Sequence, residues 1–296
     1  MAPIIDVIRH AEAWHNVCRS NIQDPGLTPD GEAQCYKLRD TYPFMDKVSH
    51  VVSSPAQRAV ATALIAFDPV VTKGKKAILL PDLQETGAKL SDTGSPPKRL
   101  EALFKPHVDL SHLSERWYRR DADSDYAPDA AKVEARARRA RRFIRRLARA
   151  ARDDDDAHIV VVTHGGFAHF LTEDYEALGP GSFTDYDNAE LKSYRFADLN
   201  ADDDEDAPLV RVEWSADLKP LPAPEPPLDE QEKAARKSFA VDRVRLQALK
   251  ERMRTLRRRK EAAVSPRERE VASRLEASCQ AAYADFMDYW RRRNAT

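Results

Sequence analysis

Short apolar runs rich in β-branched residues alternate with longer amphipathic stretches along most of the chain. The runs have the length and composition of buried strands. They lie at Ile4–Ile8, Val48–Ser53, Ala77–Leu80 and Ile159–Val162. Apolar residues at helical spacing predict helices at Pro29–Tyr42, Ala56–Ala66 and Ala131–Arg152, with another from Phe167. Strands that alternate with helices indicate an α/β fold, which we expect to be a three-layer α/β/α structure with a mostly parallel sheet.

Two of the predicted helices begin with the same sequence pattern. Thr28-Pro29 and Ser54-Pro55 each place a capping hydroxyl before a proline. The hydroxyl can accept from a free backbone N–H, and proline lacks an N–H that the first turn does not need. Both helix N-termini should point toward the carboxyl ends of the strands, where they favour an anion.

The segment between about residues 87 and 130 is irregular and rich in proline. A long irregular segment inside a compact domain is usually a lid or a binding insertion. Its aromatic residues Phe104, Trp117, Tyr118 and Tyr126 could line a pocket, although aromatics under a long loop more often form a satellite core. The next helix, Ala131–Arg152, carries an apolar stripe that should face the sheet and leave most of its arginines in water. An acidic run follows at once, which disfavours nucleic-acid binding by this helix.

The C-terminal part differs in composition. Leu209–Trp214 alternates as an edge strand would, and a proline-rich spacer follows at 219–228. We therefore predict a catalytic domain at 1–218, a linker at 219–228 and a charged helical extension at 229–296. The extension should form two helices, the second with Val271, Leu275, Ala282, Phe286 and either Tyr289 or Trp290 on one side. These helices could dock on the domain, form a hairpin or pair with another chain.

Composition narrows the class of protein. Charged residues make up 33% of the 296 residues and nearly cancel, at a net charge of −1, so no polyanionic partner is indicated. The three cysteines are too few and too scattered for a disulfide framework or a zinc site. No signal segment is visible, and no apolar run approaches the roughly 18 residues of a membrane helix. We expect a cytoplasmic protein with no membrane or nucleic-acid partner.

Basic and nucleophilic side chains follow three of the predicted strands. Arg9-His10 follows the first, Arg58 lies in the first turn after the second, and His164 follows the strand that ends at Val162. The carboxyl ends of strands form the accessible crevice of an open α/β sheet. An imidazole is a nucleophile near neutral pH, and a guanidinium offers forked donors to phosphate.

These residues lie in motifs that resemble those of the histidine phosphatase superfamily, also called phosphoglycerate mutase-like. Arg9-His10 with Asn16 is similar to its opening pattern, and Leu27 to Gln34 to its Leu-Thr-x-x-Gly-x-x-Gln segment. Ser53 to Ala63 resembles its Ser-Ser-Pro-x-x-Arg-Ala-x-x-Thr-Ala segment, and Val162 to Gly166 its second histidine motif. The resemblance covers about residues 4 to 214.

Ala11 departs from the family pattern, which usually has glycine there. Alanine adopts a positive φ only at a cost, so the loop beside His10 could be shaped differently. The form Arg-His-Ala, with His15-Asn16 and with Asp187 to Glu190 near Tyr194, looks like a fungal and plant subgroup. We therefore interpret Ala11 as a subgroup trait.

The resemblance implies a metal-independent phosphatase without a cofactor. His10 would attack a small phosphorylated metabolite and become phosphohistidine, while Arg9, Arg58 and His164 hold the phosphate. Glu85 of Leu83-Gln84-Glu85 would be the proton donor, with Asp92 as the alternative. Asn16 and Thr28 would contact the phosphate or shape the loop, and no role can be derived for His15.

Other functions stay open. A phosphoglycerate mutase needs the same pocket, but the His-Tyr-Gly signature of the mutases is absent after the Leu-x-Glu. The pocket could instead process a diphosphate in secondary metabolism, or serve a non-catalytic binding or regulatory module whose C-terminal helices self-associate.

Overall fold

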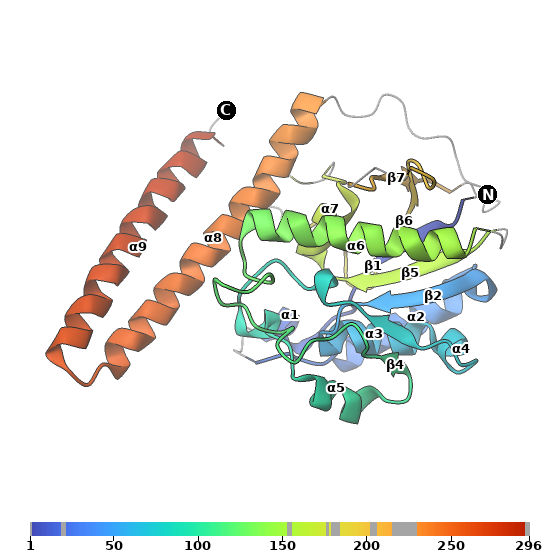
Figure 1. Cartoon of the computed structure of the whole chain (residues 1–296), viewed down its shortest axis with the longest axis horizontal. Helices are drawn as coiled ribbons and strands as arrows, with labels where there is room; N and C mark the ends of the chain where they lie inside the picture. The colour runs from blue at the N-terminus through green and yellow to red at the C-terminus, as the bar shows by residue number, and fades with distance from the viewer. Residues whose placement is uncertain are drawn as a thin grey trace.

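The computed structural model describes residues 2–18, 22–152, 156–175, 178, 184–201, 206–214 and 230–293. Its strands form a single seven-stranded sheet with the order β4-β3-β2-β5-β1-β6-β7 (Figure 1). The strands are β1 Ile4–Arg9, β2 Val48–Ser53, β3 Ala77–Leu79, β4 Val108–Asp109, β5 His158–Thr163, β6 Leu191–Phe196 and β7 Leu209–Val212. Strands β4 to β1 in this order pair in parallel, and β6 and β7 add antiparallel pairs at one edge.

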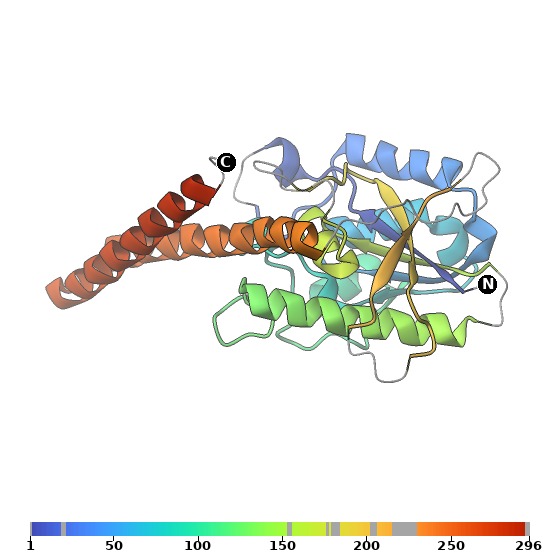
Figure 2. The ribbon, with the colours of Figure 1, turned by 90° about the horizontal axis from the view of Figure 1, so that it is seen from above.

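Helices cover both faces of the sheet, as the alternating pattern predicts. The helices of the domain are α1 Trp14–Val17, α2 Pro29–Thr41, α3 Gln57–Ala66, α4 Asp68–Val71, α5 Pro97–Phe104, α6 Ala130–Ala150 and α7 Gly165–Thr172. Single 3₁₀ turns lie at Met45–Lys47, Pro81–Leu83 and Leu90–Asp92. Figure 2 shows α2 and α6 on opposite sides of the sheet. One core cluster joins the sheet to α6 and α7, and the other joins it to α2 and α3. The expected three-layer architecture is confirmed.

Two parts of the domain differ from the expectation. Strand β6 was not predicted, because its Lys192 and Ser193 interrupt the apolar pattern although both are buried. The insertion contains α5 and β4, and its Trp117 is buried in the core cluster with Leu100 rather than lining an open pocket. Trp117 thus belongs to a main core cluster rather than to a separate satellite core, and it packs so closely that a Cβ atom at Gly94 would overlap its ring.

Helix α6 also buries more charge than its sequence suggests. Arg136, Arg141 and Arg145 are buried, whereas Arg142 and Arg146 are exposed. Arg141 donates to the carbonyls of Phe170 and Leu171 at 2.8 and 3.3 Å. Some arginines of this helix therefore bind backbone oxygens inside the domain. The expectation that its arginines lie in water is wrong for Arg136, Arg141 and Arg145.

Helices α8 Glu230–Ala262 and α9 Pro266–Arg293 form a hairpin that extends away from the domain (Figures 1 and 2). Ala240 and Val244 of α8 are buried in the core cluster of α6 and α7. The extension thus both forms a hairpin and docks on the domain. The face of α9 that packs on α8 contains Ala272 and Cys279, whereas the predicted stripe is exposed at Val271 and Leu275.

The proposed linker at 219–228 lies outside the described residues, so the domain boundaries stay a prediction. No helix in the described part of the chain is long and apolar enough to cross a membrane.

Candidate active site

The strand ends that carry the predicted site residues lie side by side. Strand β5 pairs in parallel with both β1 and β2, and Arg9 is opposite Thr163 while Ser53 is opposite Val162. Each strand therefore ends at the same level of the sheet. The next residue of each strand, His10, Ser54 and His164, is buried at this shared edge.

Arg58 joins the two histidines. Its Nε donates to His10 Nε2 at 3.1 Å, and its Nη2 lies 3.1 Å from His164 Nδ1. A guanidinium only donates, so both of these ring nitrogens accept and carry no proton. The other ring nitrogens must hold the hydrogens, and they meet acceptors: His10 Nδ1 faces the carbonyl of Ala11 at 2.8 Å, and His164 Nε2 faces Ser54 Oγ at 2.8 Å. The geometry therefore selects one tautomer of each ring.

Electrostatics keep both rings neutral. Burial lowers the pKa of His10 and of His164 well below the usual value, and the adjacent Arg58 cation lowers each further. A neutral His10 presents an unprotonated Nε2 to whatever anion Arg58 binds. This is the state that a nucleophile requires.

The backbone around His10 is held from both sides. Thr62 Oγ1 accepts from the N–H of Ala11 at 3.0 Å, and Asn188 Nδ2 donates to the carbonyl of His10 at 3.0 Å. Ala11 is fully buried and is not among the described residues with positive φ. Alanine at this position therefore causes no backbone strain, and the loop does not require glycine.

Glu85 approaches the histidines from the loop after β3. Its Oε1 accepts from the N–H of Thr86 at 2.8 Å, and its Oε2 accepts from the N–H of Gly166 at 3.3 Å. Gly166 lies in the first turn of α7, directly after His164 and Gly165. One carboxylate oxygen of Glu85 is thus held at the first turn of α7, and the other within its own loop.

Buried Arg136 and half-buried Arg120 hold the backbone of Glu85. Arg120 Nη1 and Arg136 Nη2 donate to its carbonyl at 2.8 and 3.2 Å, and Arg136 Nη1 also donates to the carbonyls of Asp82 and Gln84. Sequence reasoning missed both residues. The only sequence signal for the burial of Arg136 is its position next to apolar Ala137 in the helical pattern. Its acceptors are backbone carbonyls, which no sequence pattern marks.

Asp92, the alternative candidate for the proton donor, pairs with Arg58. Its Oδ1 is 3.5 Å from Arg58 Nη2, and burial raises the pKa of its carboxyl although the Arg58 charge opposes this. Arg120 Nη2 also donates to the backbone carbonyl of Asp92 at 2.9 Å. Asp92 therefore orients Arg58, while Glu85 faces α7.

The remaining predicted residues serve mainly the loops. Arg9 Nη1 donates to the carbonyl of Tyr186 at 2.6 Å, and the Arg9 charge contributes to lowering the pKa of His10. Asn16 Oδ1 accepts from Ala13 at the start of α1. Thr28 Oγ1 caps α2 by accepting from Gly31 at 3.0 Å, as predicted. These contacts favour loop shaping by Asn16 and Thr28 over phosphate contact.

His15, for which the sequence suggested no role, lies beside His10. Its ring centroid is 5.5 Å from that of His10, and its Nδ1 is buried without a hydrogen-bond partner. Burial and the charge of Arg58 lower the pKa of His15 to about 3, so the ring is neutral. The sequence marks His15 only by its position in the motif, next to Asn16.

The part of the chain that carries these side chains matches the model of a protein family. The model describes the Histidine phosphatase superfamily (branch 1) and matches residues 5–201. The chain belongs to the histidine phosphatase superfamily. Membership confirms the resemblance seen in the motifs. No curated protein matches the chain significantly. Within the described ranges, no group of three or more His, Cys, Asp or Glu side chains could hold a metal ion.

The comparison with solved structures returns several proteins that are named as phosphatases. A mycobacterial glucosyl-3-phosphoglycerate phosphatase is 22% identical with a TM-score of 0.46, covering 73% of this chain and 100% of that chain. A phosphoserine phosphatase from Entamoeba histolytica is 16% identical with a TM-score of 0.41, covering 71% and 94%. An ecdysone phosphate phosphatase from Bombyx mori is 16% identical with a TM-score of 0.46, covering 77% and 98%.

Proposed function

We propose that this histidine phosphatase superfamily member hydrolyses a small phosphorylated metabolite through a phosphohistidine intermediate, without a metal. The observation that carries the proposal is the contact of Arg58 with the unprotonated Nε2 of His10 and with His164. A phosphate that binds Arg58 would be brought directly to this nitrogen.

The reaction proceeds in two displacements. His10 Nε2 attacks phosphorus in line, the P–O bond to the leaving group breaks, and Glu85 donates a proton to the departing oxygen. Water then attacks the phosphohistidine, Glu85 takes back a proton, and His10 and inorganic phosphate are released. Arg9, Arg58 and His164 hold the charge that builds up on the equatorial oxygens.

Glu85 is favoured over Asp92 as the proton donor because of its position. Its carboxylate is fixed at the first turn of α7 by Gly166, whereas Asp92 is paired with Arg58. The assignment to a fungal and plant subgroup rests on the motif residues alone and stays a prediction. A cytoplasmic location stays a prediction too.

The test is phosphate release from p-nitrophenyl phosphate by purified full-length protein in the presence of a chelator. We expect turnover by the wild type and none by His10→Ala, with a phosphorylated wild type that is labile to acid and stable to alkali, as phosphohistidine is. A folded wild type that releases no phosphate would refute the proposal and favour a binding module. Activity that His10→Ala retains would refute the intermediate.

A further inference from the structure

The first half of helix α8 packs on the domain beside the loop that carries Glu85. Ala240 and Val244 are 7% and 2% exposed, and they belong to the core cluster that also contains Leu83 and Phe167. Leu83 lies at the start of the Glu85 loop, and Phe167 lies in the first turn of α7. The position of α8 is therefore set by the same core that supports the two segments around Glu85.

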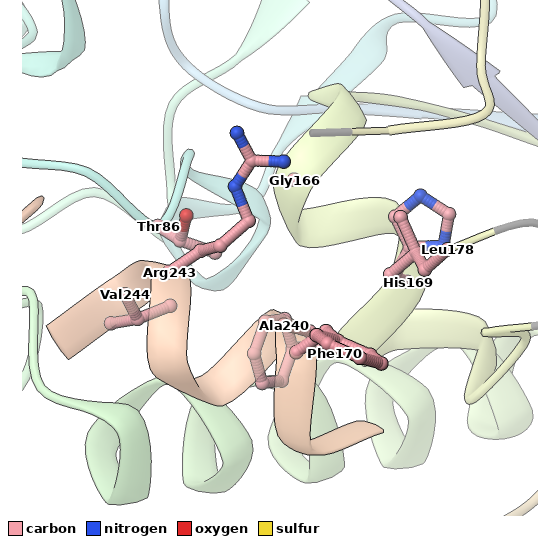
Figure 3. A pocket seen from close by; sticks show the side chains of 9 residues that line it. Thr86, Gly166, His169, Phe170, Leu178, Ala240, Arg243 and Val244 are labelled. Carbon is pink, nitrogen blue, oxygen red and sulfur yellow. The ribbon is translucent and has the colours of Figure 1, made fainter. Parts of the chain in front are cut away.

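Helix α8 closes the outer side of these two segments. Thr86 and Gly166 line a small cavity on the domain side, and Ala240, Arg243 and Val244 line it on the α8 side. In Figure 3 the Arg243 side chain extends from α8 toward Gly166, with Thr86 alongside. The cavity volume is about 10 Å³, which is room for roughly one water molecule. The loop and the start of α7 are therefore backed by α8 rather than by bulk water.

The two segments that α8 backs are the ones that orient the proposed proton donor. The N–H of Thr86 donates to Glu85 Oε1 at 2.8 Å, and the N–H of Gly166 donates to Glu85 Oε2 at 3.3 Å. The second bond joins the loop to α7, so it depends on how closely these two segments approach each other. Because α8 borders both segments, its packing helps to fix that approach.

The loop also passes between α8 and Asp92, which pairs with Arg58. A Cβ atom at Gly87 would overlap Asp92 Oδ2 and would lie 2.7 Å from Gln247 Oε1. Gly87 is not among the described residues with positive φ, so glycine serves the close approach here and not an unusual backbone conformation. Gln247 lies one helical turn after Arg243, so two successive turns of α8 border the loop.

The residues that the proposed mechanism assigns to the phosphate are supported differently. His10 and His164 directly follow β1 and β5, and Arg58 of α3 lies 3.1 Å from a ring nitrogen of each. These strands and α3 belong to the domain itself. A loosened α8 should therefore disturb proton transfer from Glu85 and leave the attack by His10 nearly intact.

We propose that Val244 and Gln247 of α8 are positioning residues for Glu85, so that the C-terminal extension completes the active site of the domain. Both side chains act by holding the loop from Glu85 to Gly87 against α7. The inference rests on the proposed function, because it takes Glu85 as the acid that protonates the leaving group.

The test uses the full-length protein and two aryl phosphates of similar shape. p-Nitrophenyl phosphate has a good leaving group, whereas phenyl phosphate has a poorer one that needs the acid. The kcat and KM on both substrates are measured for the wild type, Val244→Ala and Gln247→Ala. Leu256→Ala is the matched control, because Leu256 is a buried apolar residue of the same helix that lies beside Ala272 of α9. Each variant is also combined with Glu85→Gln.

We expect Val244→Ala and Gln247→Ala to lower kcat on phenyl phosphate by about tenfold and on p-nitrophenyl phosphate by less than about twofold, with KM nearly unchanged. Leu256→Ala should change neither rate. In the Glu85→Gln background the two α8 variants should leave the ratio of the two rates unchanged, because positioning residues act only through the acid.

Equal losses on both substrates, losses that Leu256→Ala shares, or losses that persist in full in the Glu85→Gln background would overturn the proposal. Turnover of p-nitrophenyl phosphate by the wild type and its loss in His10→Ala test the proposed function separately. If the wild type and Glu85→Gln behave as expected while the α8 variants match Leu256→Ala, only the role of α8 is refuted.

Discussion

Replacement of Arg136 by methionine tests whether a buried guanidinium behind the site positions Glu85. Arg136 is fully buried on α6 and donates to the carbonyls of Asp82, Gln84 and Glu85 at 2.9, 2.8 and 3.2 Å. Its guanidinium also lies 4.6 Å from the ring centroid of Phe167. Burial lowers the pKa of Arg136 to about 9, which leaves it charged at neutral pH. Methionine keeps much of the apolar contact and removes every donor.

The expected loss of stability depends on which carbonyls lose their hydrogen-bond donor. The carbonyl of Glu85 keeps its bond from Arg120, whereas the buried carbonyl of Gln84 loses the donor at 2.8 Å. An orphaned buried acceptor costs about 1–3 kcal/mol. Relief from burying a charge offsets part of this cost. We therefore expect the free energy of unfolding to fall by about 2 kcal/mol. A displacement of the Glu85 loop by about 1 Å would lower kcat by about 100-fold.

The assay pairs urea unfolding with the rate of phosphate release. Arg142→Met serves as the control, because Arg142 is exposed on the same helix. We expect this control to change stability by less than about 0.5 kcal/mol and to leave kcat unchanged. If Arg136→Met is as stable and as active as Arg142→Met, the carbonyl contacts do not position Glu85 and the reasoning is wrong.

Three further outcomes are expected. Glu85→Gln should slow hydrolysis of an alkyl phosphate by about 10²–10⁴-fold. It should slow hydrolysis of p-nitrophenyl phosphate much less, because a good leaving group needs no acid. Asp92→Asn should slow the hydrolysis of both substrates alike. Because the folded-state pKa values of His10 and His164 are lowered, the unfolded chain takes up protons below its pKa of about 6.5 while the native state does not. Stability is therefore lost as pH falls below about 6.5, by up to about 1.4 kcal/mol per pH unit for each ring, measured by urea unfolding at several pH values. Finally, exposed Leu275 on α9 predicts self-association of the hairpin with a second copy, and Leu275→Glu should shift the sedimentation coefficient from dimer to monomer.

Each of these three predictions has an outcome that would contradict it. Equal leaving-group dependence of Glu85→Gln and Asp92→Asn would remove the distinction between the two carboxylates. A pH dependence of stability that the double variant His10→Gln and His164→Gln leaves unchanged would show that other groups cause it. A wild type that sediments as a monomer at all concentrations would rule out pairing through α9.

The sequence predicted the elements that carry the candidate site because their signals are local. Strands such as Val48–Ser53 and helix starts such as Thr28-Pro29 follow from periodicity and capping, which neighbouring residues determine. Because parallel strands deliver their ends to one edge, the motifs also predicted that His10, Arg58 and His164 would meet. The structure brings these three together as expected.

Strand β6 shows what local patterns miss. Its polar residues are buried because partners distant in the chain satisfy them: Ser193 Oγ donates to Asp6 Oδ1 at 2.6 Å, and Lys192 pairs with Asp185. A pattern of apolar and polar residues counts such positions as solvent-facing. Only the folded arrangement reveals that each buried donor has an acceptor.

The surroundings of the site were decided by tertiary structure alone. Helical periodicity predicted that α6 and α8 would form, but not that Arg136 would bind the carbonyls behind Glu85 or that Arg243 would face Gly166. Backbone carbonyls carry no sequence signal, and the docking of one helix depends on surfaces assembled from distant segments. The sequence thus determined the parallel strands β1, β2, β3 and β5, the capped start of α2 at Thr28-Pro29 and the candidate site residues Arg9, His10, Arg58 and His164, whereas the predicted cap Ser54 is not the N-cap of α3. Tertiary packing decided their tautomers, their charge states and the residues that hold them, because these depend on burial and on partners remote in the chain.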